Sequence, residues 1–151
     1  IINYKTMKVL VFGKNGQLGN QLIKDFGKDK NFIFLSRDQA NFINLKQIEE
    51  IIYKIKPRVI INAAAYTNVN LAEDESGTAN IVNGKALQLI SNTSKKLNIF
   101  LIHYSTDYVF DGKSKKAYTE TDLPNPINAY GYSKLIGEKY IMNSGCNYII
   151  F

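Results

Sequence analysis

The sequence contains one cysteine, one histidine and no tryptophan among its 151 residues. A single Cys146 cannot form an internal disulfide, and together with the lone His103 it does not provide the ligand cluster of a Cys- or His-based metal site. No apolar run is long enough to cross a bilayer, and no signal-peptide pattern opens the chain. We therefore predict a cytoplasmic protein with no membrane partner and no metal site.

The charged residues are also not concentrated anywhere. Nineteen Lys and Arg against 13 Asp and Glu give a net charge of +6, but the lysines are scattered along the chain. Without a tight basic cluster we expect no nucleic-acid partner, although a basic surface would suit an anionic nucleotide substrate. The length is enough for one domain with a sizeable core and hardly for two.

Apolar runs and helical spacing alternate along the chain. Near-continuous apolar runs at 7–12, 31–35, 58–62 and 98–103 are typical of buried parallel strands. Apolar residues at helical spacing follow the first of these runs, continue after Asn44, which can cap a helix, and recur from Asn80 to Leu97. This order predicts an α/β protein with a Rossmann-type doubly wound parallel sheet and helices on both faces.

A glycine-rich turn joins the first expected strand to the first expected helix. Its spacing is G-x-x-G-x-x-G, and glycines at such a junction let a pyrophosphate approach backbone N–H groups at the helix N-terminus. A bare turn is the alternative, but the strand before it and the amphipathic helix after it favour dinucleotide binding. We predict that the cofactor contacts lie at Gly13, Asn15, Gly16, Gln17, Leu18 and Gly19.

Two further strand ends are expected to face the same cofactor. The second strand ends at Ser36-Arg37, whose hydroxyl and guanidinium would suit a 2′-phosphate and favour NADPH, with NADH as the alternative. The competing interpretation is a solvated Arg37 beside Asp38. The third strand leads into Ala63, Ala64 and Ala65, small residues that suit close passage of a cofactor, tight packing or both.

Three side chains have the chemistry of carbonyl reduction. Tyr130 and Lys134 are four residues apart, so on a helix they project from one face. An ammonium beside a phenol favours the phenolate, and a phenol tuned in this way is a competent general acid. Thr106 follows the strand at 98–103 with Ser105, at the sheet edge where ligands of open α/β sheets bind.

Other polar residues receive more modest interpretations. Asn83, on the expected 80–97 helix, is either solvated or a residue that helps to position the site. The acidic residues at 73–75 are expected to mark an exposed helix start, and His103 is expected to be packed or locally hydrogen-bonded.

Four segments together resemble the dTDP-4-dehydrorhamnose reductase family of the extended short-chain dehydrogenase/reductases. They are Gly13–Gly19, Asn62–Thr67, Ser105–Gly112 and the run from Tyr130 to Lys139. The resemblance implies reduction of the 4-keto group of a dTDP-linked deoxyhexose to give dTDP-L-rhamnose. In that case Tyr130 protonates the carbonyl oxygen, Thr106 binds that oxygen, and Tyr130 and Lys134 both contact the cofactor, with Lys134 holding the nicotinamide ribose. The resemblance also implies sugar contacts at Thr67, Ser105, Thr106, Asp107 and Tyr108.

The sequence departs from that family at a few positions. Gln21 replaces a Glu near the family's metal-linked dimer contact, which makes a role for Mg²⁺ doubtful. Residues 1–6 precede Met7 and are interpreted as a non-native or upstream extension. The chain ends within an apolar strand pattern at Phe151, so residues 7–151 are expected to be an NAD(P)-binding Rossmann domain truncated at its C-terminus.

This interpretation leaves the activity and the partners of the fragment open, and it has two rivals. The fragment could be inactive, could form a homodimer, or could be completed by a C-terminal half on another chain. A different extended short-chain nucleotide-sugar enzyme such as an epimerase is a close rival. A non-catalytic NAD(P)-binding protein like the regulatory subunit of methionine adenosyltransferase is the alternative from another class.

Overall fold

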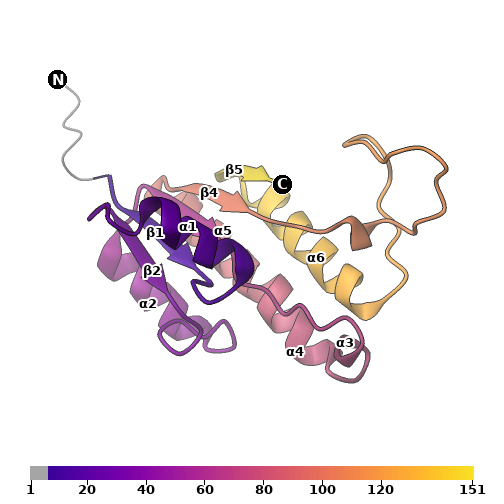
Figure 1. Ribbon diagram of the computed structural model, residues 1–151, viewed down its shortest axis with the longest axis horizontal. Helices are drawn as coiled ribbons and strands as arrows, with labels where there is room; N and C mark the ends of the chain where they lie inside the picture. Colours follow the sequence, from indigo (N-terminus) through magenta and orange to yellow (C-terminus); the bar gives the residue numbers. More distant parts are fainter. Residues whose placement is uncertain (1–6) are drawn as a thin grey trace.

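Five parallel strands form the sheet at the centre of the molecule, with the order β2-β1-β3-β4-β5 (Figure 1). The computed structural model describes residues 7–151, so the interpretation of residues 1–6 falls outside the described residues. The strands are β1 (Val9–Phe12), β2 (Phe32–Leu35), β3 (Val59–Asn62), β4 (Phe100–His103) and β5 (Asn147–Ile150). The four strands predicted from apolar runs are confirmed, each trimmed by one or two residues at its ends.

Helices connect successive strands. The α-helices are α1 (Gln17–Phe26), α2 (Leu45–Ile55), α3 (Leu71–Asp74), α4 (Ser76–Asn80), α5 (Ala86–Leu97) and α6 (Ala129–Ser144). A π-helical turn, η2 (Ile81–Lys85), joins α4 to α5, and a 3₁₀ turn, η3 (Asp107–Val109), follows β4. The side chain of Asn44 accepts a hydrogen bond from the Gln47 N–H at 3.2 Å, as the predicted cap requires.

The direction of winding reverses between β1 and β3. β1 pairs with β2 on one side and with β3 on the other, in register through Phe12↔Leu35 and Phe12↔Asn62. In open parallel sheets such a reversal leaves a crevice beyond the strand ends, and ligands bind there. The fold therefore confirms the Rossmann-type prediction and locates the crevice at the ends of β1 and β3.

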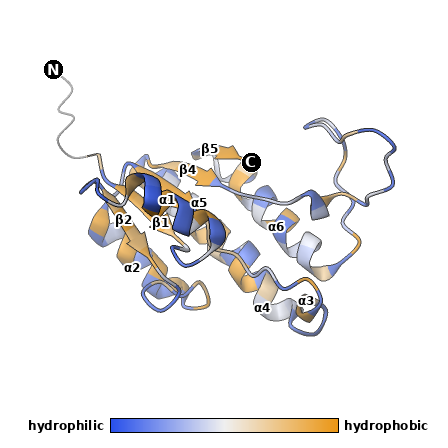
Figure 2. Cartoon of the chain, viewed as in Figure 1, coloured by the Kyte–Doolittle hydropathy of each residue, from blue (hydrophilic) through white to orange (hydrophobic). Residues whose placement is uncertain are grey.

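The two faces of the sheet are covered unequally. Leu10, Phe12 and Leu101 are fully buried and belong to one cluster with residues of α2, α5 and α6. Val11 lies in the cluster on the opposite face, which includes Leu22 of α1. Alternate strand residues therefore enter different cores, as the pleat requires. Figure 2 shows apolar strands enclosed by helices whose outer surfaces are more hydrophilic.

The segment from Asn80 to Leu97 is not the continuous helix that its apolar spacing predicts. The backbone widens into η2 at Ile81–Lys85 before α5 begins. Inside this turn Asn83 is 1% exposed and bonds to the backbone of Tyr66 and to the side chain of Ser133. Tertiary hydrogen bonds to distant residues thus accompany the wider turn, and π-helical turns inside helices are frequent at functional sites.

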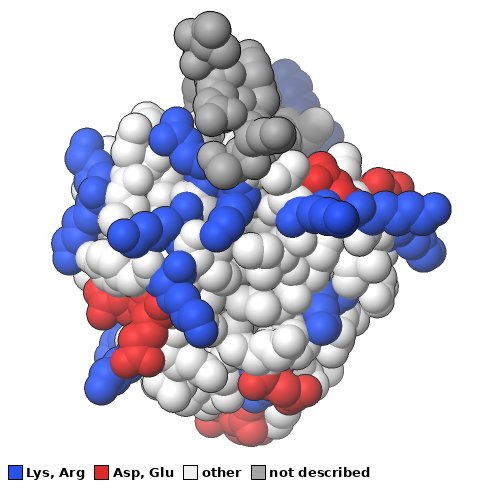
Figure 3. All heavy atoms as spheres, turned by 90° about the vertical axis from the view of Figure 1, so that its left-hand side faces the viewer, with Lys and Arg blue, Asp and Glu red and all other residues white. Residues whose placement is uncertain are grey.

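The basic side chains are spread over the surface in view in Figure 3, as the even spacing of lysines along the sequence indicates. Figure 3 shows Lys and Arg side chains distributed around one face, with acidic groups between them. No helix within residues 7–151 is long and apolar enough to cross a membrane.

Candidate functional site

A cavity of about 220 Å³ lies at the ends of β1 and β3, where the winding reverses. Its wall is formed mainly by three segments: the glycine turn after β1, the loop after β2 and the segment after β3. Its lining residues are Gly13, Gly16, Arg37, Ala40, Asn41, Phe42, Ala63, Ala64, Ala65, Tyr66, Thr67 and Val82. The structure thus brings together seven of the residues predicted to bind cofactor or substrate from three separate parts of the sequence.

Two glycines make the close approach of chain segments at this cavity possible. Gly13 has φ +88°, and a Cβ atom there would lie 2.6 Å from the backbone of Ala63. A Cβ atom on Gly19 would lie 2.2 Å from the carbonyl oxygen of Gly13. A side chain at position 13 would therefore push the turn away from the segment after β3, and one at position 19 would push α1 away from the turn, which explains why glycine is needed at both.

The remaining predicted residues of the glycine turn lie outside the cavity wall. Gln17 is the first residue of α1 and Leu18 the second, while Gly19 is buried in the first turn of the helix. Asn15 is an exposed loop residue whose carbonyl oxygen accepts from the Asn20 side chain at 3.3 Å. Free N–H groups in the first turn of a helix favour an anion, and Gly16 at the N-cap connects this helix end to the cavity.

Gln39 holds the donors at the tip of β2. Its Oε1 atom accepts from Lys14 Nζ at 3.0 Å, from the Ser36 N–H at 3.1 Å and from Ser36 Oγ at 3.2 Å. Ser36 is buried and is not part of the cavity wall, whereas the exposed Arg37 is. The sequence interpretation missed Lys14 and Gln39 because their approach depends on the fold of two separate loops.

Tyr130 and Lys134 lie one turn apart on α6, as predicted from their spacing. Both are buried, with exposed fractions of 9% and 2%. The Tyr130 and Tyr108 rings form a T-shaped pair with their centroids 5.5 Å apart. Tyr130 also belongs to a cluster with Tyr66, a residue of the cavity wall. The pair is therefore adjacent to the cavity without lining it.

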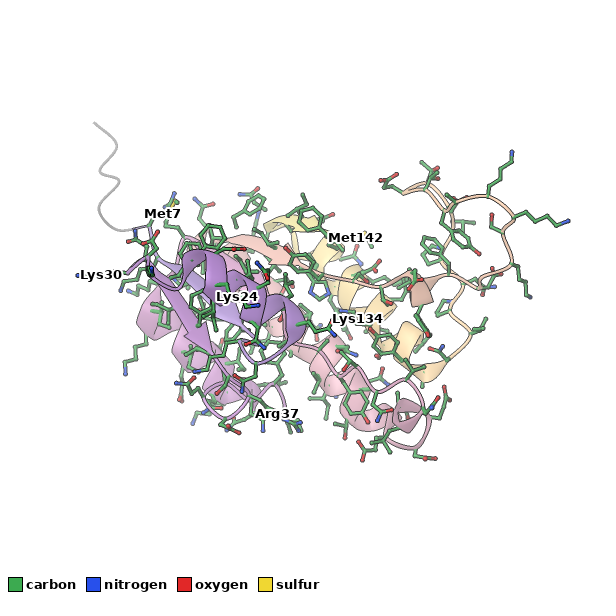
Figure 4. The ribbon with its side chains drawn as sticks, viewed as in Figure 1. Met7, Lys24, Lys30, Arg37, Lys134 and Met142 are labelled. Carbon is green, nitrogen blue, oxygen red and sulfur yellow. The ribbon has the colours of Figure 1, made fainter. Side chains whose placement is uncertain are left out.

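Lys134 reaches from α6 to the end of β4 (Figure 4). Its Nζ atom donates to the Tyr104 carbonyl oxygen at 2.6 Å and lies 3.3 Å from His103 Nε2. Burial lowers the pKa of Lys134 to about 8, while the negative charge of Glu138 acts in the opposite direction. Burial, assisted by the Lys134 charge, lowers the pKa of His103 to about 3. His103 is packed and locally bonded, as the sequence predicted.

The predicted substrate contacts after β4 line a second, open hollow of about 910 Å³. Ser105, Thr106 and Asp107 lie on its wall, but Tyr108 does not. Thr106 Oγ1 accepts from the Tyr108 N–H at 3.2 Å and so caps η3. Ser105 Oγ donates to the Glu138 carboxylate, so its hydroxyl proton is already engaged.

Asn83 connects the cavity wall to the helix that carries the Tyr–Lys pair. Its side chain accepts from the Tyr66 N–H at 2.9 Å and donates to the Tyr66 carbonyl at 3.0 Å. It also donates to Ser133 Oγ at 2.9 Å, and Ser133 donates to the Tyr130 carbonyl at 2.7 Å. Of the two interpretations from sequence, the structure supports a buried positioning residue and contradicts a solvated one.

The acidic segment at 73–75 is exposed, as predicted, but it also makes specific contacts. Glu73 Oε1 accepts from the Ala129 N–H at 2.8 Å, at the start of α6. Glu75 Oε2 accepts from the Tyr66 hydroxyl at 2.8 Å. Within residues 7–151, no group of three or more His, Cys, Asp or Glu residues is arranged to hold a metal ion.

The sheet topology, the glycine turn at the reversal point and the adjacent Tyr–Lys pair define a Rossmann-type α/β protein with the residue pattern of the short-chain dehydrogenase/reductases. A family model described as the RmlD substrate binding domain matches residues 7–151. The chain belongs to this family.

Curated relatives of the chain include dTDP-4-dehydrorhamnose reductases. The chain is 41% identical over 145 residues to a dTDP-4-dehydrorhamnose reductase of Burkholderia thailandensis, covering 96% of the chain and 49% of the relative. It is 37% identical over 149 residues to the Salmonella typhimurium enzyme of the same name, with 96% and 50% covered. The chain therefore spans about half the length of these curated relatives.

Solved structures agree with the fold. The crystal structure of dTDP-4-dehydrorhamnose reductase from Bacillus anthracis in complex with NADP matches with a TM-score of 0.90 and 33% identity. This match covers 96% of the chain and 52% of the solved chain.

Proposed function

We propose that residues 7–151 are the NAD(P)-binding Rossmann domain of a dTDP-4-dehydrorhamnose reductase of the cytoplasm. The reaction is reduction of the 4-keto group of dTDP-4-dehydro-L-rhamnose to an alcohol, giving dTDP-L-rhamnose. The observation that carries the proposal is the buried Tyr130–Lys134 pair beside the cavity at the β1/β3 reversal, in a chain of this family. A general acid must lie next to the bound cofactor for reduction to occur there.

The residues of the cavity fit a dinucleotide. The first turn of α1 offers unpaired N–H groups to a pyrophosphate, and the glycines at 13 and 16 leave the backbone accessible. The small side chains of Ala63, Ala64 and Ala65 leave room in the wall opposite. When bound, NADPH or NADH supplies the hydride.

The chain's own residues hold and move the proton. Hydride addition to the carbonyl carbon places negative charge on the oxygen, and Tyr130 donates its phenolic proton to that oxygen. Thr106, three residues after β4, would turn its hydroxyl from the Asp107 carboxylate, to which it donates at 3.3 Å, to the oxygen as the charge develops. Lys134 would hold the ribose hydroxyls of the cofactor and orient it. The sugar would leave as an alcohol that carries the hydride supplied by the cofactor and the proton from Tyr130, and water would restore the Tyr130 phenol.

The arrangement around Gln39 favours NADPH over NADH. Lys14 and Ser36 direct three donors at one neutral amide oxygen, and Arg37 adds a guanidinium beside them. A phosphate accepts such hydrogen bonds more strongly than an amide does. The 2′-phosphate of NADPH would replace the Gln39 oxygen as the acceptor for these donors.

Binding and turnover of the purified chain test the proposal. The fluorescence of reduced nicotinamide should show saturable NADPH binding, and Tyr130→Phe should still bind because it keeps the aromatic ring and leaves every other cofactor contact in place. Wild-type chain should then oxidise NADPH when dTDP-4-dehydro-L-rhamnose is added, and Tyr130→Phe should not. Absence of NADPH and NADH binding by monodisperse protein would refute the proposal. Binding without turnover would be the result expected of an inactive fragment or of the non-catalytic NAD(P)-binding alternative, and the return of turnover on adding the C-terminal half of a relative would select the first.

A further inference from the structure

The buried polar groups at the ends of β3 and β4 form a single hydrogen-bonded series. Ala64 N–H donates to Asn62 Oδ1 at 3.1 Å, and Asn62 Nδ2 lies 3.0 Å from His103 Nδ1. His103 Nε2 lies 3.3 Å from Lys134 Nζ. Asn62 and His103 are each 1% exposed, so bulk water does not reach this series.

The first member of the series determines the orientation of the others. A backbone N–H can only donate, so the Asn62 oxygen must face Ala64 and the Asn62 NH₂ must face His103. The NH₂ group can only donate as well, so His103 Nδ1 must accept. A neutral imidazole that accepts at Nδ1 carries its proton at Nε2. The Nε2–H bond therefore points at the nitrogen of Lys134.

An ammonium group has three donors and no acceptor, so it cannot receive this proton. An uncharged amine has one lone pair and two N–H bonds. It can accept from His103 Nε2–H and still donate to the Tyr104 carbonyl oxygen, which lies 2.6 Å away. The other arrangements, with a charged Lys134 or a rotated Asn62, each place two donors face to face in the buried series.

We propose that His103 is a positioning residue whose Nε2–H donates to Lys134 and so favours the uncharged amine of this side chain over its ammonium form in the cofactor-free protein. The inference rests on the proposed function only where it takes Lys134 to contact the ribose of the cofactor. The acceptors of a bound ribose and the anionic pyrophosphate would favour the ammonium form, so cofactor binding would bring a proton to Lys134.

The charged and titratable groups around Lys134 act on the same balance between amine and ammonium. From β4, His103 is neutral above acidic pH because burial lowers its pKa to about 3. On α6, Glu138 lies one turn beyond Lys134 and favours the charged form, and Tyr130 lies one turn before it. Burial acts against the charge more strongly than Glu138 favours it, and it lowers the pKa of Lys134 to about 8, so the ammonium is still the larger fraction at pH 7 and the amine is the larger fraction above pH 8.

Nuclear magnetic resonance of the isotopically labelled, cofactor-free chain tests the proposal without any assay of function. The ¹⁵N shifts of His103 report which ring nitrogen carries the proton, and the Lys134 side-chain signals, assigned by their loss in Lys134→Met, report its charge. We expect the Nε2–H tautomer and a Lys134 that is half protonated at or below pH 8. The Nδ1–H tautomer, or a Lys134 that stays fully charged at pH 9, would overturn the proposal.

A His103→Gln variant separates a specific hydrogen bond from general burial. The glutamine can present a carbonyl oxygen to Lys134, so the ammonium form gains an acceptor and the pKa of Lys134 should rise by about one unit. An unchanged pKa in this variant would overturn the role of His103. Failure of the chain to bind NADPH would refute the proposed function. The signals of the cofactor-free chain, and the His103 tautomer that they report, do not depend on that result.

Discussion

Gly137 on α6 lies against the backbone carbonyl oxygen of Asn83, and a Cβ atom at position 137 would come within 2.1 Å of that oxygen. This contact lets the helix that carries Tyr130 and Lys134 pack directly on the π-helical turn. We therefore predict that Gly137→Ala lowers the free energy of unfolding by about 1–3 kcal/mol through overpacking, measured by urea denaturation.

Gly77 provides the matched control for this substitution. It also lies in a helix, but a Cβ atom there would meet no atom within 4 Å. Gly77→Ala should be neutral or should stabilise the chain by up to about 1 kcal/mol through helix propensity. Equal destabilisation by both variants would show that the Gly137 contact is not the cause.

A second pair of glycines tests the cofactor turn. Gly13 and Gly112 both have positive φ, +88° and +70°, so alanine at either position carries a backbone cost of about 1–2 kcal/mol. Of the two, only Gly13 also contacts the segment that follows β3, where a Cβ atom would lie 2.6 Å from Ala63, whereas Gly112 faces open space. Gly13→Ala should abolish NADPH binding and destabilise the chain further than Gly112→Ala does. Unimpaired binding by Gly13→Ala would contradict the location of the cofactor site.

Removal of a basic side chain near Gln39 should change cofactor preference. We predict that Lys14→Ala and Arg37→Ala each weaken NADPH binding by about tenfold, or 1.4 kcal/mol, and leave NADH binding nearly unchanged. Lys24→Ala is the control, because this lysine lies in the last turn of α1, outside the cavity wall (Figure 4). Parallel titrations with both cofactors measure the ratio, and equal losses for NADPH and NADH would rule out a 2′-phosphate contact.

His103 should make the stability of the chain sensitive to mild acid. Its folded-state pKa of about 3 lies below the ordinary value of 6.5, so the unfolded chain binds more protons between these values. Stability therefore falls as pH falls below 6.5, by about 2 kcal/mol between pH 7 and pH 5. Urea denaturation at both pH values should show this loss for wild type and a smaller one for His103→Gln. The same loss in both proteins would assign it to other groups.

The strands, the helices and the spacing of Tyr130 and Lys134 could be predicted because they depend on local patterns. Near-continuous apolar runs and 3.6-residue spacing are properties of short segments, and residues four apart on a helix lie on one face. The turn at Gly13 could be recognised for the same reason, since it lies between a strand and a helix that are adjacent in the sequence.

Contacts between distant segments could not be predicted in this way. Asn83 bonds to Tyr66 and Ser133, which are 17 and 50 residues away, and these bonds accompany a π turn where apolar spacing alone indicates a continuous helix. The pairing of Ser105 with Glu138, 33 residues away, likewise depends on how α6 packs beside β4. Neither residue type indicates a distant partner by itself, because Asn, Ser and Glu are usually solvated.

Glu73 gives a further test of such a distant contact. Its carboxylate accepts from the Ala129 N–H at 2.8 Å, while Asn128 accepts from the Gly131 N–H at 2.7 Å. The two side chains thus satisfy two of the free donors at the N-terminus of α6, where negative charge is also favourable. We predict that Glu73→Ala lowers the free energy of unfolding by about 1 kcal/mol.

Asp74 is the appropriate control for Glu73, because it lies on the same short helix, is exposed and makes no side-chain hydrogen bond within residues 7–151. Asp74→Ala should change the free energy of unfolding by less than about 0.5 kcal/mol. Because Ala129 directly precedes Tyr130, loss of the Glu73 contact should also loosen the start of α6, and amide hydrogen exchange at Ala129 and Gly131 should be faster in Glu73→Ala than in Asp74→Ala. Identical exchange rates in the two variants would show that the acidic segment acts only through its overall charge.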